Sequence, residues 1–485
     1  MGIIINQSFK NMITTYVGFG IGAVNTLFLF TYFLEKEYYG LVSFLLSAAN
    51  LIWPFLVFGV HSTLIKFFTS YRTRGEQDRL LNLVLVIPLV VGLIIGFSGM
   101  IFYEYLLDYF KGENDLVQPY IWLIFLIAMA TAYFEVFFAW SKIYYKSAFG
   151  NLMKEVFHRF CISVLLFAVY FKWINIELFI YATSGVFLIR TILMALYAFS
   201  LHRPKFSFKF PENLSPVLKY SSLILLAASV ATLLLDLDKV MIEHYLPIEN
   251  VAVYGIAVYI ATVISVPQKA MHQITHPLTA EMLNKKDKAG LKDLYKKSSL
   301  NLLIISGLIF IWIITNVNSL YELIPEEYNT GILVVLLISL VKLYDNFLGN
   351  NNSILFNSDY YRIVLAVGVI LVIVAFILNI ILIPSYGIEG AAMASFIAFA
   401  IYNTLKIFIV FSKFRIHPFT SQSWLALLLT GLLCVIFYYI NLNMHPILHI
   451  SIKAILAGVL YLFIIYFFQF SAEINQMIDK FLKRS

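Results

Sequence analysis

The sequence predicts an all-α polytopic membrane protein with about 14 transmembrane helices. Of its 485 residues, 61% are hydrophobic and only 13% are charged, which is too little charge to cover a soluble protein of this size. The apolar residues form repeated runs of about 20, enough to cross roughly 30 Å of hydrocarbon as a helix. Aromatic residues gather at the ends of these runs, as an interfacial belt requires. We therefore expect nearly the whole chain to lie in a membrane.

The runs follow one another through short loops. We expect the spans at 12–34, 41–66, 80–103, 117–141, 156–171, 178–200, 216–241, 251–276, 299–318, 330–352, 363–384, 389–411, 422–441 and 449–469. The fifth run is the shortest. The N-terminal segment "MGIIINQSFKNM" has no charged region followed by a cleavage site, so the first run is expected to remain as a helix.

An internal repeat divides the spans into two halves. Tyr39-Gly40 in the second span aligns with Tyr254-Gly255 in the eighth, and His61 then aligns with His276. Spans 1–6 and 7–12 would then be two equivalent halves in the same orientation, a common transporter plan in which the substrate is handled at the interface of the repeats. The expected parts are an N-terminal lobe (1–200), a cytoplasmic linker (201–215), a C-terminal lobe (216–412), and spans 13 and 14 with a cytoplasmic tail (413–485).

The distribution of charge predicts the topology. An even number of spans places both termini on one side, together with basic loops such as "NKKDKAGLKDLYKK" (284–297). The loop "YELIPEEYNT" (321–330) on the other side is acidic. Four basic residues lie deep in spans or near their outer ends, namely Arg190, Lys239, Lys342 and Lys453. The positive-inside rule therefore predicts that both termini are cytoplasmic.

Several classes of protein are excluded or disfavoured. No GxxxxGK[ST] motif and no soluble domain are present, which excludes an ATP-driven pump in one chain. The loops on the outer side are too short to hold a catalytic site, so we expect no enzyme. The two cysteines, Cys161 and Cys434, lie in apolar runs and form neither a disulfide framework nor a metal motif. The basic residues lie in short loops, as membrane orientation requires, and we expect no nucleic-acid partner and no cofactor.

Three segments of the sequence contain motifs that can be compared with those of known membrane-protein families. The most diagnostic is "LNIILIPSYGIEGAAMASFIAFAIYNTLKIF" (378–408), a tight helical hairpin in which Pro384 ends one helix and Gly387 turns the chain. The other two are "LDLDKVMIEHYLPIENVAVYGIAVYI" (235–260) and "EKEYYGLVSFLLSAANLI" (35–52). All three resemble the corresponding segments of the Wzx-type polysaccharide flippases, a family of the MOP exporter superfamily. A departure is the extra acid and the lysine in Asp236-Leu237-Asp238-Lys239, where the family commonly has arginine.

The resemblance implies two six-helix lobes around a central cavity, plus two extra C-terminal helices. It also implies alternating access that flips undecaprenyl-pyrophosphate-linked oligosaccharides to the outer leaflet of the bacterial cytoplasmic (inner) membrane for surface polysaccharide assembly. The expected partners are the lipid-linked oligosaccharide, membrane lipids and other polysaccharide assembly proteins. A MATE-like, cation-coupled antiporter and a lipid II flippase remain alternatives. Fourteen spans argue against the antiporter, and span 1 lacks a recognisable basic pattern of the lipid II branch.

Four ionisable residues lie deep in the expected spans. Arg190 is near mid-membrane, where an unpaired charge costs ~2.5–3.5 kcal/mol on insertion scales, and we expect it to bind substrate phosphate or to pair with a neighbouring helix. Lys342 is a second substrate-binding candidate, and Asp345 at i+3 is its expected partner and a coupling device. Glu135 is a lone carboxylate that could carry H⁺ or Na⁺ or pair with a basic residue.

Two further groups complete the candidate site. Lys269, His272 and His276 share one helix face, which could receive pyrophosphate at the cytoplasmic entrance, and His61 is the repeat-matched histidine. For His61 an interfacial capping role is the favoured alternative.

At the outer end of span seven, Asp236 and Lys239 fall within ~60° on the helix, whereas Asp238 points away. This pair is either a surface ion pair or an outer gate that latches onto the N-terminal lobe.

Overall fold

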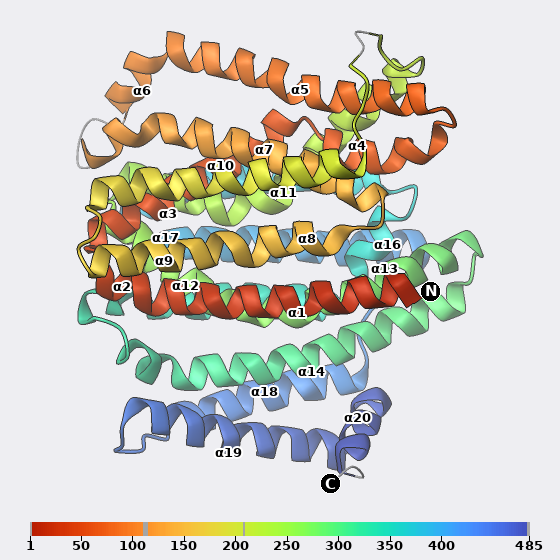
Figure 1. Cartoon of the computed structure of the whole chain (residues 1–485). Helices are drawn as coiled ribbons and strands as arrows, with labels where there is room; N and C mark the ends of the chain where they lie inside the picture. Colours follow the sequence, from red (N-terminus) through yellow and green to blue (C-terminus); the bar gives the residue numbers. More distant parts are fainter. Residues whose placement is uncertain (1, 110–114, 207–208, 483–485) are drawn as a thin grey trace. The chain divides into compact units, whose positions relative to one another are not determined.

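The computed structural model describes residues 2–109, 115–206 and 209–482. All regular structure in these ranges is helical, and Figure 1 shows long helices running alongside one another. The chain divides into two compact units, residues 1–252 and 253–485.

The first unit contains mainly membrane-length helices joined by short turns, with η marking 3₁₀ or π turns. Its elements are α1 (Gly2–Val24), η1 (Asn25–Leu29), α2 (Phe30–Phe33), α3 (Lys36–Val57), α4 (Val60–Phe67), η2 (Phe68–Ser70), α5 (Arg74–Ile101), α6 (Tyr103–Tyr109), η3 (Asp115–Tyr120), α7 (Ile121–Ile143), α8 (Ser147–Leu152), η4 (Met153–Phe157), α9 (His158–Tyr170), α10 (Ile176–Leu201) and α11 (Leu214–Tyr245). Helix α7 packs against α3 and α10, and α11 packs against α3. Trp140 and Phe134 of α7 are fully buried, which makes α7 a central helix of this unit.

The second unit begins within α12 (Glu249–Thr262). It continues with η5 (Val263–Ser265), α13 (Val266–Asn284), α14 (Lys288–Tyr321), η6 (Glu326–Gly331), α15 (Ile332–Phe347), α16 (Asn351–Phe356), α17 (Tyr361–Phe414), α18 (Ser421–Tyr439), α19 (Pro446–Phe467) and α20 (Ala472–Leu482). Its main apolar core joins α14, α15, α18 and α19 and includes Ile311, Ala426 and Tyr461. Figure 1 shows α18 and α19 beside α14.

The prediction of about 14 spans is confirmed. Eleven helical segments of the described chain are long and apolar enough to cross a membrane. One of them, Arg362–Phe414, is two helices that meet at Gly387, as the hairpin motif predicted. Helix α11 and the shorter α9 supply the other two expected spans. The division into lobes at 201–215 remains a prediction, since in the structure α11 packs within the first unit.

Two glycines permit backbone turns that other residues resist. Gly387 has φ 60° and ψ −140°, a region that is essentially open to glycine alone. Gly349, with φ 54°, lies between α15 and α16 and interrupts the helix there. Broken helices at membrane depth are tolerated where neighbouring side chains satisfy the freed backbone groups. The residues around Gly349 are therefore candidates for a functional site.

Candidate functional site

Arg190 is held by aromatic rings in the first unit. Its guanidinium carbon lies 4.3 Å from the ring centroid of Phe134 and 4.7 Å from that of Phe187. One nitrogen donates a long hydrogen bond of 3.4 Å to Thr131 Oγ1. The residue is 4% exposed, and no carboxylate of the described chain lies within ion-pair distance of it. The positive charge is therefore stabilised by π-faces, which leaves guanidinium hydrogens available for an anionic ligand.

Glu135 lies on α7, one helical turn after Thr131. Lys154 Nζ lies 2.6 Å from Glu135 Oε1, so the prediction that Glu135 is a lone carboxylate is wrong. Lys154 lies in the loop expected between the spans 117–141 and 156–171. In the structure the chain there is helical, as α8 and the π turn η4, and this brings Lys154 to Glu135. Glu135 is instead the ion-pair partner of a neighbouring basic residue, which was the alternative to a lone carboxylate.

His61 belongs to the same neighbourhood. It lies on α4, half-buried, with its ring centroid 6.1 Å from that of Trp53 in an edge-to-face arrangement. It interacts electrostatically with Glu135 and Lys154. The structure thus brings together three residues that the sequence treated separately, Arg190, Glu135 and His61.

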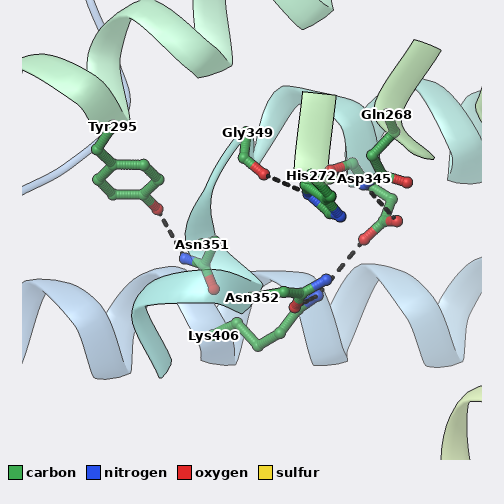
Figure 2. Close-up of polar contacts among 8 residues, drawn as sticks. All are labelled: Gln268, His272, Tyr295, Asp345, Gly349, Asn351, Asn352 and Lys406. Carbon is green, nitrogen blue, oxygen red and sulfur yellow. Dashed lines mark hydrogen bonds and ion pairs between the residues drawn. The ribbon is translucent and has the colours of Figure 1, made fainter. Parts of the chain in front are cut away.

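The second unit holds a buried polar network, shown in Figure 2. Asp345, near the end of α15, forms an ion pair with Lys406 of α17 at 3.4 Å, and Gln268 Nε2 donates to its other oxygen at 3.1 Å. Lys406 Nζ also donates to Asn352 Oδ1 at 3.1 Å. Lys406 is 1% exposed, whereas the side chain of Asp345 is 25% exposed, so the acid is the accessible half of the pair.

The predicted Lys342–Asp345 ion pair is absent from the ion pairs of the described residues, and this correction has a simple geometric reason. Lys342 Nζ lies 5.5 Å from the ring centroid of Phe399 on α17. Lys406, from the same helix α17, forms the ion pair with the Asp345 carboxylate. Lys342 still interacts electrostatically with Asp345 and Lys269.

The break between α15 and α16 is closed by neighbouring side chains. The carbonyl of Gly349 accepts a 3.3 Å hydrogen bond from His272 Nε2, and Asn351 Nδ2 donates to Tyr295 Oη at 2.6 Å (Figure 2). His276 follows on α13, with its ring centroid 5.5 Å from that of His272. His276 and Lys269 are exposed, so this face of α13 runs from a buried contact to the surface.

Asp236 contacts the second span of the first unit. Its carboxylate is held by side-chain hydrogen bonds with Ser47 and Asn50 of α3, and Lys239 interacts with it electrostatically. Asp236 and Lys239 both lie within α11, which continues to Tyr245. Asp236 therefore has a position suited to a latch between α11 and α3.

Lys406 does not stand out in the sequence as a candidate site residue. It lies in the twelfth span close to its expected inner end, where a lysine can reach water along the helix. One feature of the sequence does indicate that Lys406 is buried in the span. The apolar segment "IFIVF" follows it, and α17 continues for two further turns to Phe414. Among the described residues there is no group of three or more His, Cys, Asp or Glu side chains placed to hold a metal ion.

Comparison with known proteins agrees with this architecture. The chain resembles an uncharacterized membrane protein of Methanocaldococcus jannaschii, with 22% identity over 423 residues, covering 81% of each chain. Its fold is similar to that of the lipid II flippase MurJ in an inward closed conformation, with a TM-score of 0.69 and 15% identity over 95% of this chain and 99% of the other. It is also similar to a MATE-family multidrug transporter of the MOP superfamily in an inward-facing conformation, with a TM-score of 0.58 and 15% identity over 86% of this chain and 95% of the other.

The family model described as polysaccharide biosynthesis protein matches residues 5–282, more than half of the chain. The match confirms the resemblance seen in the sequence to polysaccharide biosynthesis proteins, and the solved structures share the fold. The chain is thus a multi-pass membrane protein that belongs to the polysaccharide biosynthesis protein family.

Proposed function

We propose that this protein flips an undecaprenyl-pyrophosphate-linked oligosaccharide from the cytoplasmic to the outer leaflet by alternating access, for surface polysaccharide assembly. The observation that carries the proposal is the buried guanidinium of Arg190, which has aromatic neighbours and no carboxylate partner in the described chain. A pyrophosphate moving through hydrocarbon requires fixed positive charge, and Arg offers planar paired donors for phosphate oxygens.

The second unit would contribute its own cations to this path. Lys342 is half-buried near Asp345, and the face formed by Lys269, His272 and His276 leads to the surface of α13. These residues would receive the phosphates, while the lipid tail remains in the bilayer. His61 would hold the equivalent place in the first unit.

Coupling to H⁺ or Na⁺ would act through the carboxylates. Protonation of Asp345 would remove the charge that holds Lys406, and Glu135 would act in the same way on Lys154. Asp236 and Lys239 would close the outer exit by holding α11 against α3. In this proposal both termini are cytoplasmic in the inner membrane of a bacterium, and residues 1–200 and 216–412 are the two moving lobes.

The antiporter remains the second candidate, because the fold is similar to that of MATE transporters and each unit contains an acid within its spans, Glu135 and Asp345. A cation-binding cavity would need those acids to be available, however. Glu135 and Asp345 are each paired with a lysine, which favours an anionic substrate. The lipid II flippase alternative shares that substrate chemistry and differs in the glycan.

The test is leaflet exchange in proteoliposomes that contain an undecaprenyl-pyrophosphate oligosaccharide, with a glycosidase outside to report exposed glycan. We expect Arg190→Ala to abolish exchange, and also surface polysaccharide production in cells, at a normal protein level. Arg74→Ala, which removes an exposed arginine at the start of α5, is the matched control and should leave exchange unchanged. Exchange at the wild-type rate in Arg190→Ala would show that Arg190 is not in the substrate path. Movement of a cationic dye but not of the glycolipid would favour the antiporter.

A further inference from the structure

A second buried cation in the second unit plays no part in the proposed transport path. Lys453 lies on the stripe of α19 that faces α14, between His449 and Ala457, and is 2% exposed. The register of the two antiparallel helices is fixed at two points. His449 Nδ1 is hydrogen-bonded with Ser319 Oγ, and Trp312 Nε1 donates to the carbonyl of Ala454 at 2.8 Å.

This register places Lys453 level with Thr315 and Asn316, one turn deeper than the His449–Ser319 contact. We call these five residues (Thr315, Asn316, Ser319, His449 and Lys453) the α14–α19 seam. All five are buried.

Both a donor and an acceptor of the seam are buried without a hydrogen-bond partner among the described residues, and the acceptor is Asn316 Oδ1. No carboxylate of the described chain lies within ion-pair distance of Lys453. His449 Nε2 is buried and has no hydrogen-bond partner among the described residues. When the Ser319 hydroxyl donates to Nδ1, Nε2 carries the ring hydrogen and is a donor. An ammonium group and an imidazole N–H on one helix face can both donate hydrogen bonds to the oxygens of a phosphate.

The seam lies near the end of the membrane span at which α19 begins. Lys453 lies seven residues after Pro446, about 10 Å along the axis, and helical side chains lean toward the N-terminal end of their helix. Its ammonium group therefore lies within about one turn of the level at which α19 begins. The opposite face of α19 is apolar and exposed, with Ile455, Leu456 and Val459 more than half exposed, as expected for a helix against lipid.

We propose that the α14–α19 seam binds the phosphate of an anionic membrane phospholipid, with Lys453 as the ion-pair partner and His449 Nε2 as the second donor. The bound lipid would join the last span to α14. The phosphate chemistry is shared with the lipid-linked pyrophosphate of the proposed function. We assign the bulk phospholipid because α19 packs mainly on α14, α18 and α20, away from the Asp345–Lys406 pair on α15 and α17.

The experiment uses the full-length protein purified in mild detergent and titrated with short-chain phosphatidylglycerol, with zwitterionic phosphatidylcholine as the control lipid. The readouts are the thermal midpoint and the number of lipids retained in native mass spectrometry. We expect phosphatidylglycerol to stabilise the wild type at concentrations on the order of tenfold lower than phosphatidylcholine. Lys453→Met, which keeps the length and removes the charge, should lose this difference, while Lys453→Arg should keep it.

Two further variants make the result specific. Lys172→Met removes an exposed lysine from another loop and should keep the phosphatidylglycerol preference. His449→Gln should weaken the preference several-fold, and it provides an independent test should Lys453→Met fail to fold.

Equal stabilisation of the wild type by both lipids, or an unchanged preference in Lys453→Met, would overturn the assignment. Lys453-dependent stabilisation by the lipid-linked pyrophosphate alone would also overturn it, by assigning the seam to the transported lipid. None of these outcomes depends on Arg190, so this test and that of the proposed function fail separately.

Discussion

The Asp345–Lys406 pair gives a prediction about stability that distinguishes its two members. We consider Asp345→Asn, Lys406→Met and the double variant. Each single change leaves one charge in the buried network, whereas the double change removes both. Breaking a buried pair typically costs ~3–5 kcal/mol, and replacing the whole pair by neutral side chains costs much less.

The magnitude follows from the geometry. Two unit charges 3.4 Å apart attract by about 5 kcal/mol at an effective dielectric constant of 20. Asp345→Asn leaves Lys406 1% exposed, with Asn352 Oδ1 and the Tyr402 ring, 4.5 Å from Nζ, as its remaining partners. Lys406→Met leaves an acid that is 25% exposed and still accepts from Gln268. We therefore expect a loss near 5 kcal/mol for Asp345→Asn and near 3 kcal/mol for Lys406→Met.

The assay is unfolding of the purified protein by SDS titration in mixed micelles, with helicity as the signal. The double variant should be more stable than Asp345→Asn, which corresponds to a coupling energy of more than about 3 kcal/mol. Additive losses, or a larger loss for Lys406→Met than for Asp345→Asn, would refute the idea that a desolvated lysine is held by this carboxylate.

Three other predictions concern separate parts of the molecule. Lys342→Arg should keep more leaflet exchange than Lys342→Ala, because the first retains the charge; equal activity of the two variants would remove Lys342 from the substrate path. Gly390→Ala should lower the thermal midpoint and the expression level, since a Cβ there would lie 2.1 Å from the carbonyl oxygen of Leu382; a midpoint equal to that of the wild type would contradict this close packing. Cysteines in place of Ser47 and Asp236 should form a disulfide under oxidation and block exchange until reduced, because the two side chains meet between α3 and α11. Failure to crosslink, or full exchange by the crosslinked protein, would count against the latch.

The comparison of sequence and structure is most instructive at the charged residues. The sequence indicated that Glu135, Arg190 and Asp345 lie at membrane depth, because a charge within an apolar run stands out without any knowledge of the fold. It could not identify their partners. Lys154 reaches Glu135 because η4 continues the helix beyond the expected loop, and Lys406 reaches Asp345 from a helix about 60 residues further along the chain.

The sequence alone determined the membrane class, the number of spans, the family resemblance and the turn at Gly387. These properties follow from local composition and from single residues whose backbone or charge is unusual in an apolar run. Only the tertiary structure decided which charge neutralises which, and that Arg190 has aromatic neighbours in place of an acid. The physical reason is that Coulombic and π contacts act over a few ångströms, so helix packing selects among candidates that the sequence leaves equivalent.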